Sequence, residues 1–295
     1  MKKLKGIIPV LVSPVTKDGG IDEQGYINLL EHTLRHPIGG YWILGSASED
    51  FLMSYKDRLH AARIIAAHVK GRVPVIAGCG APVLEEVYQF FDDTAGMQID
   101  AYHLLPTDRK MRPALVEKYV RMVADRAPKP VWLYNNELRG LKIPVEVVNE
   151  LKAHPNVAGI KAAGYDLKDI VPFCMMHSEK FQTIGSGGSH LLTFLAMGCD
   201  AHTSSGASSW PREFCEAYDL WQRGKLAEAR EAAFSLSRLT KALPHPANTE
   251  FCAEEKGVLE ALGICKRYVY PPFWPCTDEE MVQVRKVLRA HGKLP

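Results

Sequence analysis

The sequence predicts an α/β fold, a (β/α)8 TIM barrel followed by a C-terminal appendage of three helices. Eight short apolar runs, each of a length typical of a buried strand, alternate along the chain with amphipathic segments of helical period. Each unit of strand plus helix takes about 20 to 33 residues, which suits such a barrel. After residue 223 the alternation stops and only helical patterns follow. We therefore expect the barrel over residues 1–223 and the appendage over residues 224–295.

The expected strands are apolar runs bounded by Gly, Pro, Asn, Asp or Ser. They are Ile7–Ser13, Tyr41–Leu44, Val73–Ala77, Ala101–Leu105, Val131–Tyr134, Val157–Ile160, Gln182–Ile184 and Ala201–Ser204. Helical segments are expected near residues 22–36, 55–70, 82–95, 113–126, 144–153, 167–177, 188–197 and 210–222, and in the appendage at 225–241, 249–262 and 278–291. Asp22, Ser54 and Asp166 are residue types that cap helix N-termini. Pro113 and Pro144 suit a first helical turn.

A doubly wound sheet would use the same alternation of strands and helices. It would normally carry a glycine-rich phosphate loop after an early strand, whereas Ile7–Ser13 is followed by Pro14-Val15-Thr16. The stretch Gly185-Ser186-Gly187-Gly188 is rich in glycine but lacks the spacing of a dinucleotide loop. The barrel is therefore the favoured architecture.

Composition excludes several classes of partner. The formal net charge is +2 over 295 residues, so nothing indicates binding to nucleic acid or to an anionic membrane surface. No apolar segment approaches the roughly 20 residues that a membrane span needs. The seven cysteines are scattered without a C-x-x-C pair, which is typical of reduced thiols in a cytoplasmic protein.

The first candidate for chemistry is Lys161, which follows the buried run Val157–Ile160. An ammonium group at the end of a buried strand loses most of its hydration, and this favours the neutral amine. A neutral lysine is a nucleophile towards carbonyl carbons. On position alone, an equally good interpretation is that Lys161 reaches the surface or pairs with a carboxylate.

Two further groups follow other strands of the expected barrel. Active sites of barrel enzymes lie at the carboxyl ends of the strands. The second strand is followed by Gly45-Ser46-Ala47-Ser48-Glu49, and the fifth ends at Tyr134. A reaction through a lysine imine needs an amine, a group that moves protons and a place for the substrate's carboxylate. Lys161, Tyr134 and the turn after the second strand can supply these three. Taken singly, a buried tyrosine such as Tyr134 is more often only a core residue, and a turn such as residues 45–49 more often has no role in binding.

The ordered motifs carry a family resemblance. A strand ending in G-S-x-x-E is followed by R-V-P-V-I-A-G (residues 72–78), L-Y-N (133–135), G-I-K (159–161) and G-x-D (198–200). As an ordered set, these resemble the dihydrodipicolinate synthase and N-acetylneuraminate lyase superfamily of pyruvate-dependent class I aldolases. The resemblance covers essentially the whole chain, including the tail with Pro271-Pro272.

The resemblance implies a role for particular residues. Lys161 matches the lysine that forms an imine with a 2-oxo acid, and Tyr134 matches the tyrosine that relays protons beside the substrate's carboxylate. Ser46 matches the first hydroxyl of the turn that binds this carboxylate through backbone amides, which also involves Ala47 and Ser48. Arg139 falls where dihydrodipicolinate synthases keep an arginine for a second carboxylate.

The chain also departs from the family's pattern. Ala47 replaces the second hydroxyl of the turn, and Ser48 replaces the glycine after it. Asp108 stands where these enzymes commonly carry a tyrosine of a relay shared between subunits. Glu137 replaces the proline of Y-N-x-P, and Gly187-Gly188 replace acidic residues after the seventh strand. Dihydrodipicolinate synthase activity itself is therefore not expected, whereas the lysine and tyrosine of imine chemistry are both present.

We therefore expect a lyase that forms an imine between Lys161 and a small-molecule 2-oxo acid, without a cofactor or metal, and then cleaves or forms a C–C bond. A 2-keto-3-deoxy sugar-acid dehydratase acting through the same imine is the alternative. The further candidates for substrate contacts are Asp108, Asn136, Glu137, Ser186, Ser205 and Ser208. The resemblance also implies a homotetramer.

Two other interpretations are weaker. A metal-dependent barrel aldolase needs histidine and carboxylate ligands at several strand ends. His103 and His202 lie inside expected strands, with no carboxylate cluster beside them. A barrel that only binds or regulates is suggested by the relay substitutions at Ala47 and Asp108.

Overall fold

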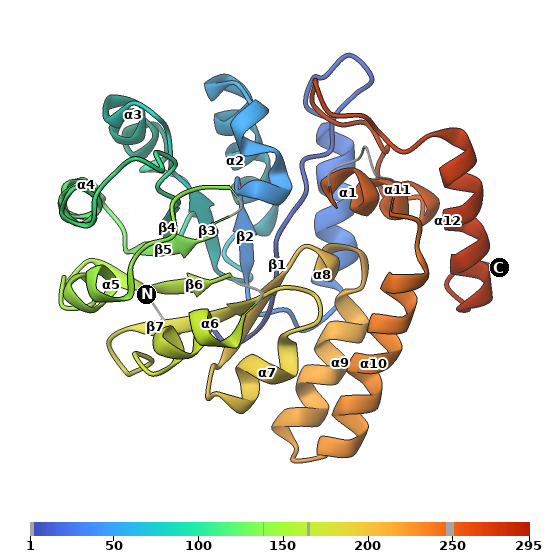
Figure 1. Cartoon of the computed structure of the whole chain (residues 1–295). Coiled ribbons are helices and arrows are strands. Elements are labelled where there is room, and N and C mark those ends of the chain that lie inside the picture. The colour runs from blue at the N-terminus through green and yellow to red at the C-terminus, as the bar shows by residue number, and fades with distance from the viewer. Residues whose placement is uncertain (1–2, 138, 164–165, 246–250) are drawn as a thin grey trace.

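The computed structural model describes residues 3–137, 139–163, 166–245 and 251–295. Figure 1 shows the strands at the centre of the molecule with helices arranged around them. Eight parallel strands pair in the order β1-β8-β7-β6-β5-β4-β3-β2. The two ends of this order approach each other through a parallel bridge between Val10 and Trp42, and the Leu11 N–H donates to the Trp42 carbonyl at 3.1 Å. The predicted TIM barrel is confirmed.

The bounds of most elements agree with the sequence-based expectation. The strands are β1 (Gly6–Pro9), β2 (Tyr41–Ile43), β3 (Val75–Gly78), β4 (Ala101–Leu104), β5 (Val131–Asn135), β6 (Val157–Ala162), β7 (Gln182–Ser186) and β8 (Ala201–Ser204). The helices up to the end of the barrel are α1 (Glu23–Leu34), α2 (Tyr55–Val69), α3 (Leu84–Thr94), α4 (Pro113–Arg126), α5 (Val145–Leu151), α6 (Leu167–Cys174), α7 (Leu191–Ala196), α8 (Gly206–Ser209) and α9 (Pro211–Gln222). Two 3-10 turns, η1 (Ser46–Ser48) and η2 (Asp50–Leu52), follow β2.

In the described part of the chain, three helices follow α9. They are α10 (Leu226–Ala242), α11 (Phe251–Ala261) and α12 (Asp278–Ala290), and the predicted start of the middle one at Thr249 lies outside the described residues. In Figure 1, α10 lies along α9, and α11 and α12 lie at the same side of the barrel. The Asn28 side chain of α1 donates to the Ile264 carbonyl of this tail at 3.1 Å. None of the described helices has the length and apolar character needed to cross a bilayer.

Several predicted boundaries were wrong, and that of the first strand by the most. This strand ends at Pro9 rather than Ser13, because its ladder with β8 ends at the Pro9–Ser204 pair and only the isolated bridge from Val10 to Trp42 follows. The helix expected from residue 188 begins only at Leu191, because the residues after β7 form a loop instead.

Helix starts follow the predicted capping chemistry. The Asp22 carboxylate accepts the Gly25 N–H at 2.9 Å, and the Ser54 hydroxyl accepts the Asp57 N–H at 3.1 Å. The Asp22 and Ser54 side chains satisfy N–H groups that have no partner within the helix, and so fix where these helices begin. Pro113 is the first residue of α4 as predicted, whereas Pro144 lies one residue before α5, at its N-cap.

Side chains along each strand point alternately into two hydrophobic cores, one between the strands and the helices and one inside the barrel. In β5, Val131 and Leu133 belong to the layer between strands and helices, whereas Trp132 and Tyr134 belong to the barrel interior. In β6, Gly159 allows close packing, because a Cβ atom there would lie 2.0 Å from the Gln182 carbonyl oxygen. This alternation places Tyr134 inside the barrel beside the register position of Lys161.

Candidate active site

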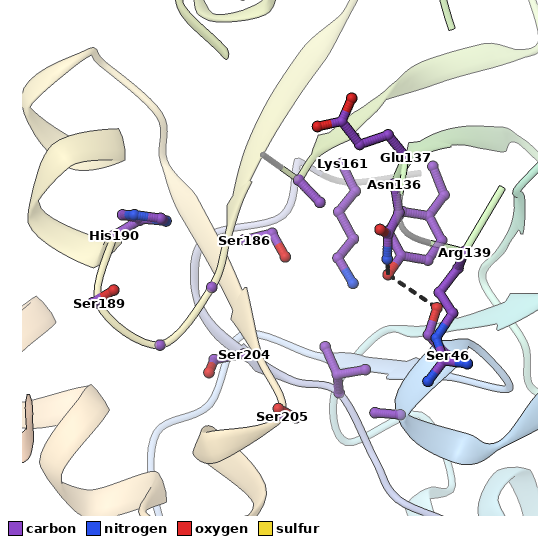
Figure 2. Close-up of a pocket in the computed structure, with 16 residues that line it drawn as sticks. Ser46, Asn136, Glu137, Arg139, Lys161, Ser186, Ser189, His190, Ser204 and Ser205 are labelled. Atoms are coloured by element: carbon purple, nitrogen blue, oxygen red, sulfur yellow. Dashed lines mark hydrogen bonds between the residues drawn. The ribbon is translucent and has the colours of Figure 1, made fainter. Parts of the chain in front are cut away.

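A cavity of about 510 Å³ lies at the carboxyl ends of the strands (Figure 2). Its walls come from the ends of β5, β6, β7 and β8, from the residue after β1 and from the turn after β2. The lining residues are Val10, Ser46, Ala47, Tyr134, Asn136, Glu137, Arg139, Lys161, Ala163, Ser186, Gly187, Gly188, Ser189, His190, Ser204 and Ser205. Barrel enzymes carry their active sites at this end.

Lys161 lies in the wall of this cavity with its side chain almost completely buried. Its residue exposure is 2%, and its Nζ lies 4.2 Å from the ring centroid of Tyr134 and 4.9 Å from that of Trp42. In Figure 2 the side chain points into the space between Asn136 and Ser186. The amine therefore faces the cavity rather than bulk water.

Burial changes the protonation of this amine. Loss of hydration lowers the pKa of Lys161, and the Tyr134 hydroxyl and the Asp50 carboxylate offset part of that effect. A lowered pKa increases the fraction of neutral amine at neutral pH, and only the neutral amine has a lone pair for attack on a carbonyl.

Tyr134 is held by its ring and by its hydroxyl. The ring makes edge contacts with Trp42 and His103, each at 5.7 Å between centroids. Its hydroxyl accepts a hydrogen bond from Nδ2 of Asn136 at 2.9 Å and lies 3.4 Å from Oγ of Ser46. The phenol thus joins the wall formed by β5 to the turn after β2, directly beside Lys161.

The turn after β2 brings Ser46 and Ala47 to the cavity. Leu44 and Glu49 bracket it with φ of 54° and 59°, in the left-handed region that side chains disfavour. Within it, the Ser48 N–H donates to the Gly45 carbonyl at 2.8 Å. The turn therefore has a defined and locally strained shape that its surroundings must hold.

The structure brings together nine of the twelve predicted site residues. The nine that line the cavity are Ser46, Ala47, Tyr134, Asn136, Glu137, Arg139, Lys161, Ser186 and Ser205. The other three, Ser48, Asp108 and Ser208, lie outside the lining, and the Ser208 hydroxyl donates to the Val10 carbonyl at 3.0 Å. The Ser48 hydroxyl donates to the Leu11 carbonyl at 2.6 Å, and Asp108 is exposed and accepts the Lys110 N–H at 2.9 Å.

The remaining cavity residues include three that sequence reasoning missed. Ser189 and His190 lie on the loop after β7, and Ser204 is the last residue of β8. The first two were placed inside an expected helix, which hid the fact that they follow a strand end. Ser204 is next to the predicted Ser205, so the strand-end rule alone was enough to find it.

The two histidines inside the barrel face backbone carbonyls. His103 Nε2 donates to the Ile43 carbonyl at 2.9 Å, and His202 Nε2 donates to the Gly187 carbonyl at 2.7 Å. Burial lowers the pKa of His202 to about 4, so its ring is neutral at neutral pH. In the described part of the chain, no three His, Cys, Asp or Glu side chains are grouped as metal ligands.

A carboxyl group from the tail contacts α8, the short helix that follows β8. The Ser209 hydroxyl of α8 donates to Oε2 of Glu255 in α11 at 2.6 Å. Burial raises the pKa of Glu255 to about 7, with a smaller opposing effect of the Ser209 hydrogen bond. The unfolded chain would titrate this group near its ordinary value of about 4.3. The folded state therefore binds an extra proton between these two values, and stability falls as pH rises through that window.

We expect Glu255→Gln to stabilise the protein at pH 8 but not at pH 5. At pH 5 the wild-type carboxyl is already protonated and resembles the amide, whereas at pH 8 the wild type must bury a carboxylate. The expected gain at pH 8 is about 3 to 4 kcal/mol, since the shift from about 4.3 to about 7 is nearly three pKa units and each unit corresponds to about 1.4 kcal/mol. Denaturant unfolding at both pH values measures it, with Glu254→Gln as the matched control. An equal change at both pH values would contradict this assignment.

A barrel with a cavity at the carboxyl ends of its strands has the architecture of barrel enzymes, which carry their active sites at that end. A sequence model of the dihydrodipicolinate synthetase family matches residues 3–291, and the chain belongs to this family. The family resemblance of the motifs is confirmed. Its members are pyruvate-dependent aldolases and related lyases, so the class of the chain is that of a lyase.

Individual relatives cover the whole chain at modest identity. The chain is 26% identical to 4-hydroxy-tetrahydrodipicolinate synthase of Thermodesulfovibrio yellowstonii, over 98% of each chain. It is 27% identical to the probable 2-dehydro-3-deoxy-D-pentonate aldolase YjhH of Escherichia coli K12, over 100% of each. Among solved structures, it is similar to YagE of E. coli K12, a prophage protein of the dihydrodipicolinic acid synthase family in complex with pyruvate. That match has a TM-score of 0.88 at 25% identity and covers 98% of each chain.

Proposed function

We propose that this protein is a class I lyase that forms an imine between Lys161 and a small 2-oxo acid of the pyruvate type. The observation that carries the proposal is the placement of the Lys161 amine. Lys161 is 2% exposed, and its amine faces a cavity at the strand ends, 4.2 Å from the ring centroid of Tyr134. The pyruvate complex of YagE, a family member, supports the choice of a pyruvate-type substrate.

The first step is attack of the neutral Lys161 amine on the C2 carbonyl carbon of the 2-oxo acid. The carbinolamine then loses its hydroxyl as water, and this requires a proton donor at the same place. Tyr134 is the group in position, because its ring is 4.2 Å from Nζ. The lowered pKa of Lys161 supports this step, since it increases the neutral fraction of the amine.

Bond cleavage uses the iminium group as an electron sink. Tyr134 takes the proton from the C4 hydroxyl, the C3–C4 bond breaks, and its electron pair forms the enamine as the aldehyde leaves. Protonation at C3 and hydrolysis of the imine then release pyruvate and the free amine. The hydrogen bond from Asn136 to the Tyr134 oxygen, at 2.9 Å, stabilises the phenolate that must form during this cycle.

The substrate's carboxylate is assigned to the turn after β2. Ser46 and Ala47 line the cavity at the start of η1, where the first N–H groups of a helical turn have no partner within it. Arg139 lines the same cavity, with its guanidinium carbon 5.9 Å from the ring centroid of Phe273. An anionic group at the far end of the substrate would face this arginine.

A 2-keto-3-deoxy sugar-acid dehydratase remains the second candidate function. It uses the same imine, but a C3 proton is removed and a hydroxyl group is expelled. The wall formed by the ends of β7 and β8 favours it, because Ser186, Ser204 and His190 offer hydroxyl and imidazole groups to a polar substrate. The similarity to a pentonate aldolase supports sugar-acid substrates in general, and leaves both reactions open.

Self-association into the homotetramer that the family resemblance implies is part of the same proposal. Two exposed aromatic side chains support it, Phe51 at 49% and Trp274 at 63% exposure. Their chain segments lie together, because the Tyr270 N–H donates to the Glu49 carboxylate at 2.6 Å. Large exposed aromatic rings of this kind are typical of interfaces.

The test is reductive trapping with borohydride and pyruvate. We expect a covalent adduct that maps to Lys161 by peptide mass spectrometry and does not form without pyruvate. Lys256 is the internal control, because its side chain is also fully buried but its Nζ is bonded to the Tyr268 carbonyl at 2.8 Å. An unmodified Lys161 under conditions that label a known family member would overturn the imine mechanism and leave a barrel that only binds.

The reaction itself is identified with a panel of 2-oxo acids and aldehydes. Release of pyruvate from a longer oxo acid identifies the aldolase, and elimination of water without pyruvate release identifies the dehydratase. An adduct on Lys161 without turnover of any compound would instead favour the binding or regulatory barrel.

A further inference from the structure

The helical tail places one lysine in the interior of the molecule, against the turn after β2. Lys256 of α11 forms an ion pair with Glu49, and both side chains are 0% exposed. Its Nζ also donates to the Tyr268 carbonyl at 2.8 Å. Lysine and glutamate are almost never fully buried unless they are paired, so this arrangement is a specific one.

Glu49 is bound to the tail through both oxygens of its carboxylate. Oε1 meets the Lys256 amine, and Oε2 accepts the Tyr270 N–H at 2.6 Å. Two tail segments, α11 and the stretch after it, therefore hold one residue of the turn. These contacts join two parts of the chain that are far apart in the sequence, the turn after β2 and the C-terminal tail.

The backbone of Glu49 shows what this contact holds in place. Its φ of 59° lies in the left-handed region, and its N–H donates to the Ser46 carbonyl at 3.2 Å. A left-handed conformation costs a residue with a side chain about 1 kcal/mol, and such strain persists only where the surroundings over-determine it. Glu49 directly follows η1, which carries Ser46 and Ala47 to the cavity wall.

We infer that the Glu49–Lys256 pair is a positioning device that sets the place of Ser46 and Ala47, and with them the carboxylate end of the substrate site. This inference rests on the proposed function, in which these two residues receive the 2-oxo acid's carboxylate. The same turn brings Oγ of Ser46 to 3.4 Å from the Tyr134 hydroxyl. Release of Glu49 from the tail would let the strained turn relax away from both partners.

The alternative is that the pair serves only stability. Buried ion pairs are poor contributors to stability, because the loss of hydration offsets most of the attraction. Replacing both partners by uncharged residues is often neutral, whereas removing one leaves an unpaired buried charge and costs about 3 to 5 kcal/mol. Replacing both Glu49 and Lys256 therefore tests the positioning role without the loss of stability that an unpaired buried charge would cause.

The experiment uses Glu49→Gln/Lys256→Met and measures pyruvate binding through borohydride trapping on Lys161. We expect the pyruvate concentration for half-maximal trapping to rise by about tenfold or more, which corresponds to about 1.4 kcal/mol of lost binding. The maximum extent of trapping at saturating pyruvate should stay at the wild-type level, because Lys161 is untouched. Lys256→Met alone should show the same shift together with a lower free energy of unfolding.

Lys293→Met is the matched control. Lys293 forms a partly buried ion pair with Glu213 of α9, in the same tail but away from the turn. This variant should lower stability and leave half-maximal trapping unchanged. If the Glu49→Gln/Lys256→Met protein, folded by circular dichroism, traps pyruvate with wild-type half-saturation, the positioning role is overturned while the imine mechanism stands. Absence of trapping in the wild type would instead overturn the proposed function itself.

Discussion

Replacement of Lys161 by methionine is expected to abolish turnover and, at the same time, to stabilise the fold. The loss of activity should be at least about 10⁴-fold, because no other group can replace a covalent nucleophile. The gain in the free energy of unfolding should be about 1 to 3 kcal/mol at pH 7, because methionine fills the same space without burying a polar amine. A loss of turnover together with a gain in stability would show that Lys161 serves catalysis at a cost in stability.

The stability gain of Lys161→Met should depend on pH in a defined direction. Burial lowers the pKa of Lys161, so between this lowered value and the ordinary value of about 10.4 the unfolded chain binds more protons than the folded one. Wild-type stability attributable to this group therefore rises with pH through that window. The advantage of the methionine variant should be larger at pH 7 than at pH 10, measured by denaturant unfolding at each pH.

Lys161→Arg provides the matched control for charge. It keeps a cation that cannot act as an amine nucleophile, so turnover should be lost as completely as with methionine, but without the gain in stability. Turnover is measured with the best substrate of the oxo-acid panel. Activity in either variant above about a ten-thousandth of the wild-type level would rule out Lys161 as the imine-forming residue.

The sequence was sufficient to predict what depends on local pattern. The apolar runs predicted strand ends at Tyr134 and Ile160, within two residues of the observed ends of β5 at Asn135 and β6 at Ala162, and the parallel barrel brings such ends to one face. Capping residues such as Asp22 and Ser54 marked helix starts because their hydroxyl or carboxylate oxygens satisfy N–H groups within three residues. Such signals are short in range and need no knowledge of the tertiary structure.

What could not be predicted depends on contacts between distant segments. Ser48 was assigned to the substrate on its position in the turn, but its hydroxyl points to the Leu11 carbonyl. Glu49 was regarded only as part of a motif, since nothing in the sequence connects it with Lys256 or Tyr270. The side of a turn that faces a cavity is decided by such partners, and they become visible only in three dimensions.

The departure at Asp108 bears on how protons move in this chain. Asp108 is exposed and does not line the cavity, so it does not substitute for the tyrosine that relatives commonly carry there. The described cavity instead contains a connected set of polar groups within one chain. Asn136 donates to the Tyr134 hydroxyl, which in turn lies near Ser46. In the proposed mechanism, proton transfer through Tyr134 therefore does not need a tyrosine at position 108 for its first step.

Tyr134→Phe is expected to lower turnover by about 10² to 10³-fold, within the range that a positioned acid–base group contributes. The ring contacts with Trp42 and His103 should be kept, because only the hydroxyl is removed. Borohydride trapping of pyruvate on Lys161 should become slower but reach the wild-type extent, since the nucleophile is intact. A slow approach to full labelling would separate a role in proton transfer from a role in holding the lysine.

Tyr102→Phe is the control that makes this result specific. Tyr102 is another buried strand tyrosine, with its hydroxyl 2.7 Å from that of Thr94 and outside the cavity lining. Its replacement should cost about 0.5 to 1.5 kcal/mol of stability for the lost hydrogen bond and leave turnover unchanged. If Tyr134→Phe and Tyr102→Phe reduced turnover equally, the effect would be one of folding, and the proton would have to pass through a different group. A loss confined to Tyr134→Phe, with trapping slowed but complete, is the result that only an acid–base phenol beside Lys161 explains.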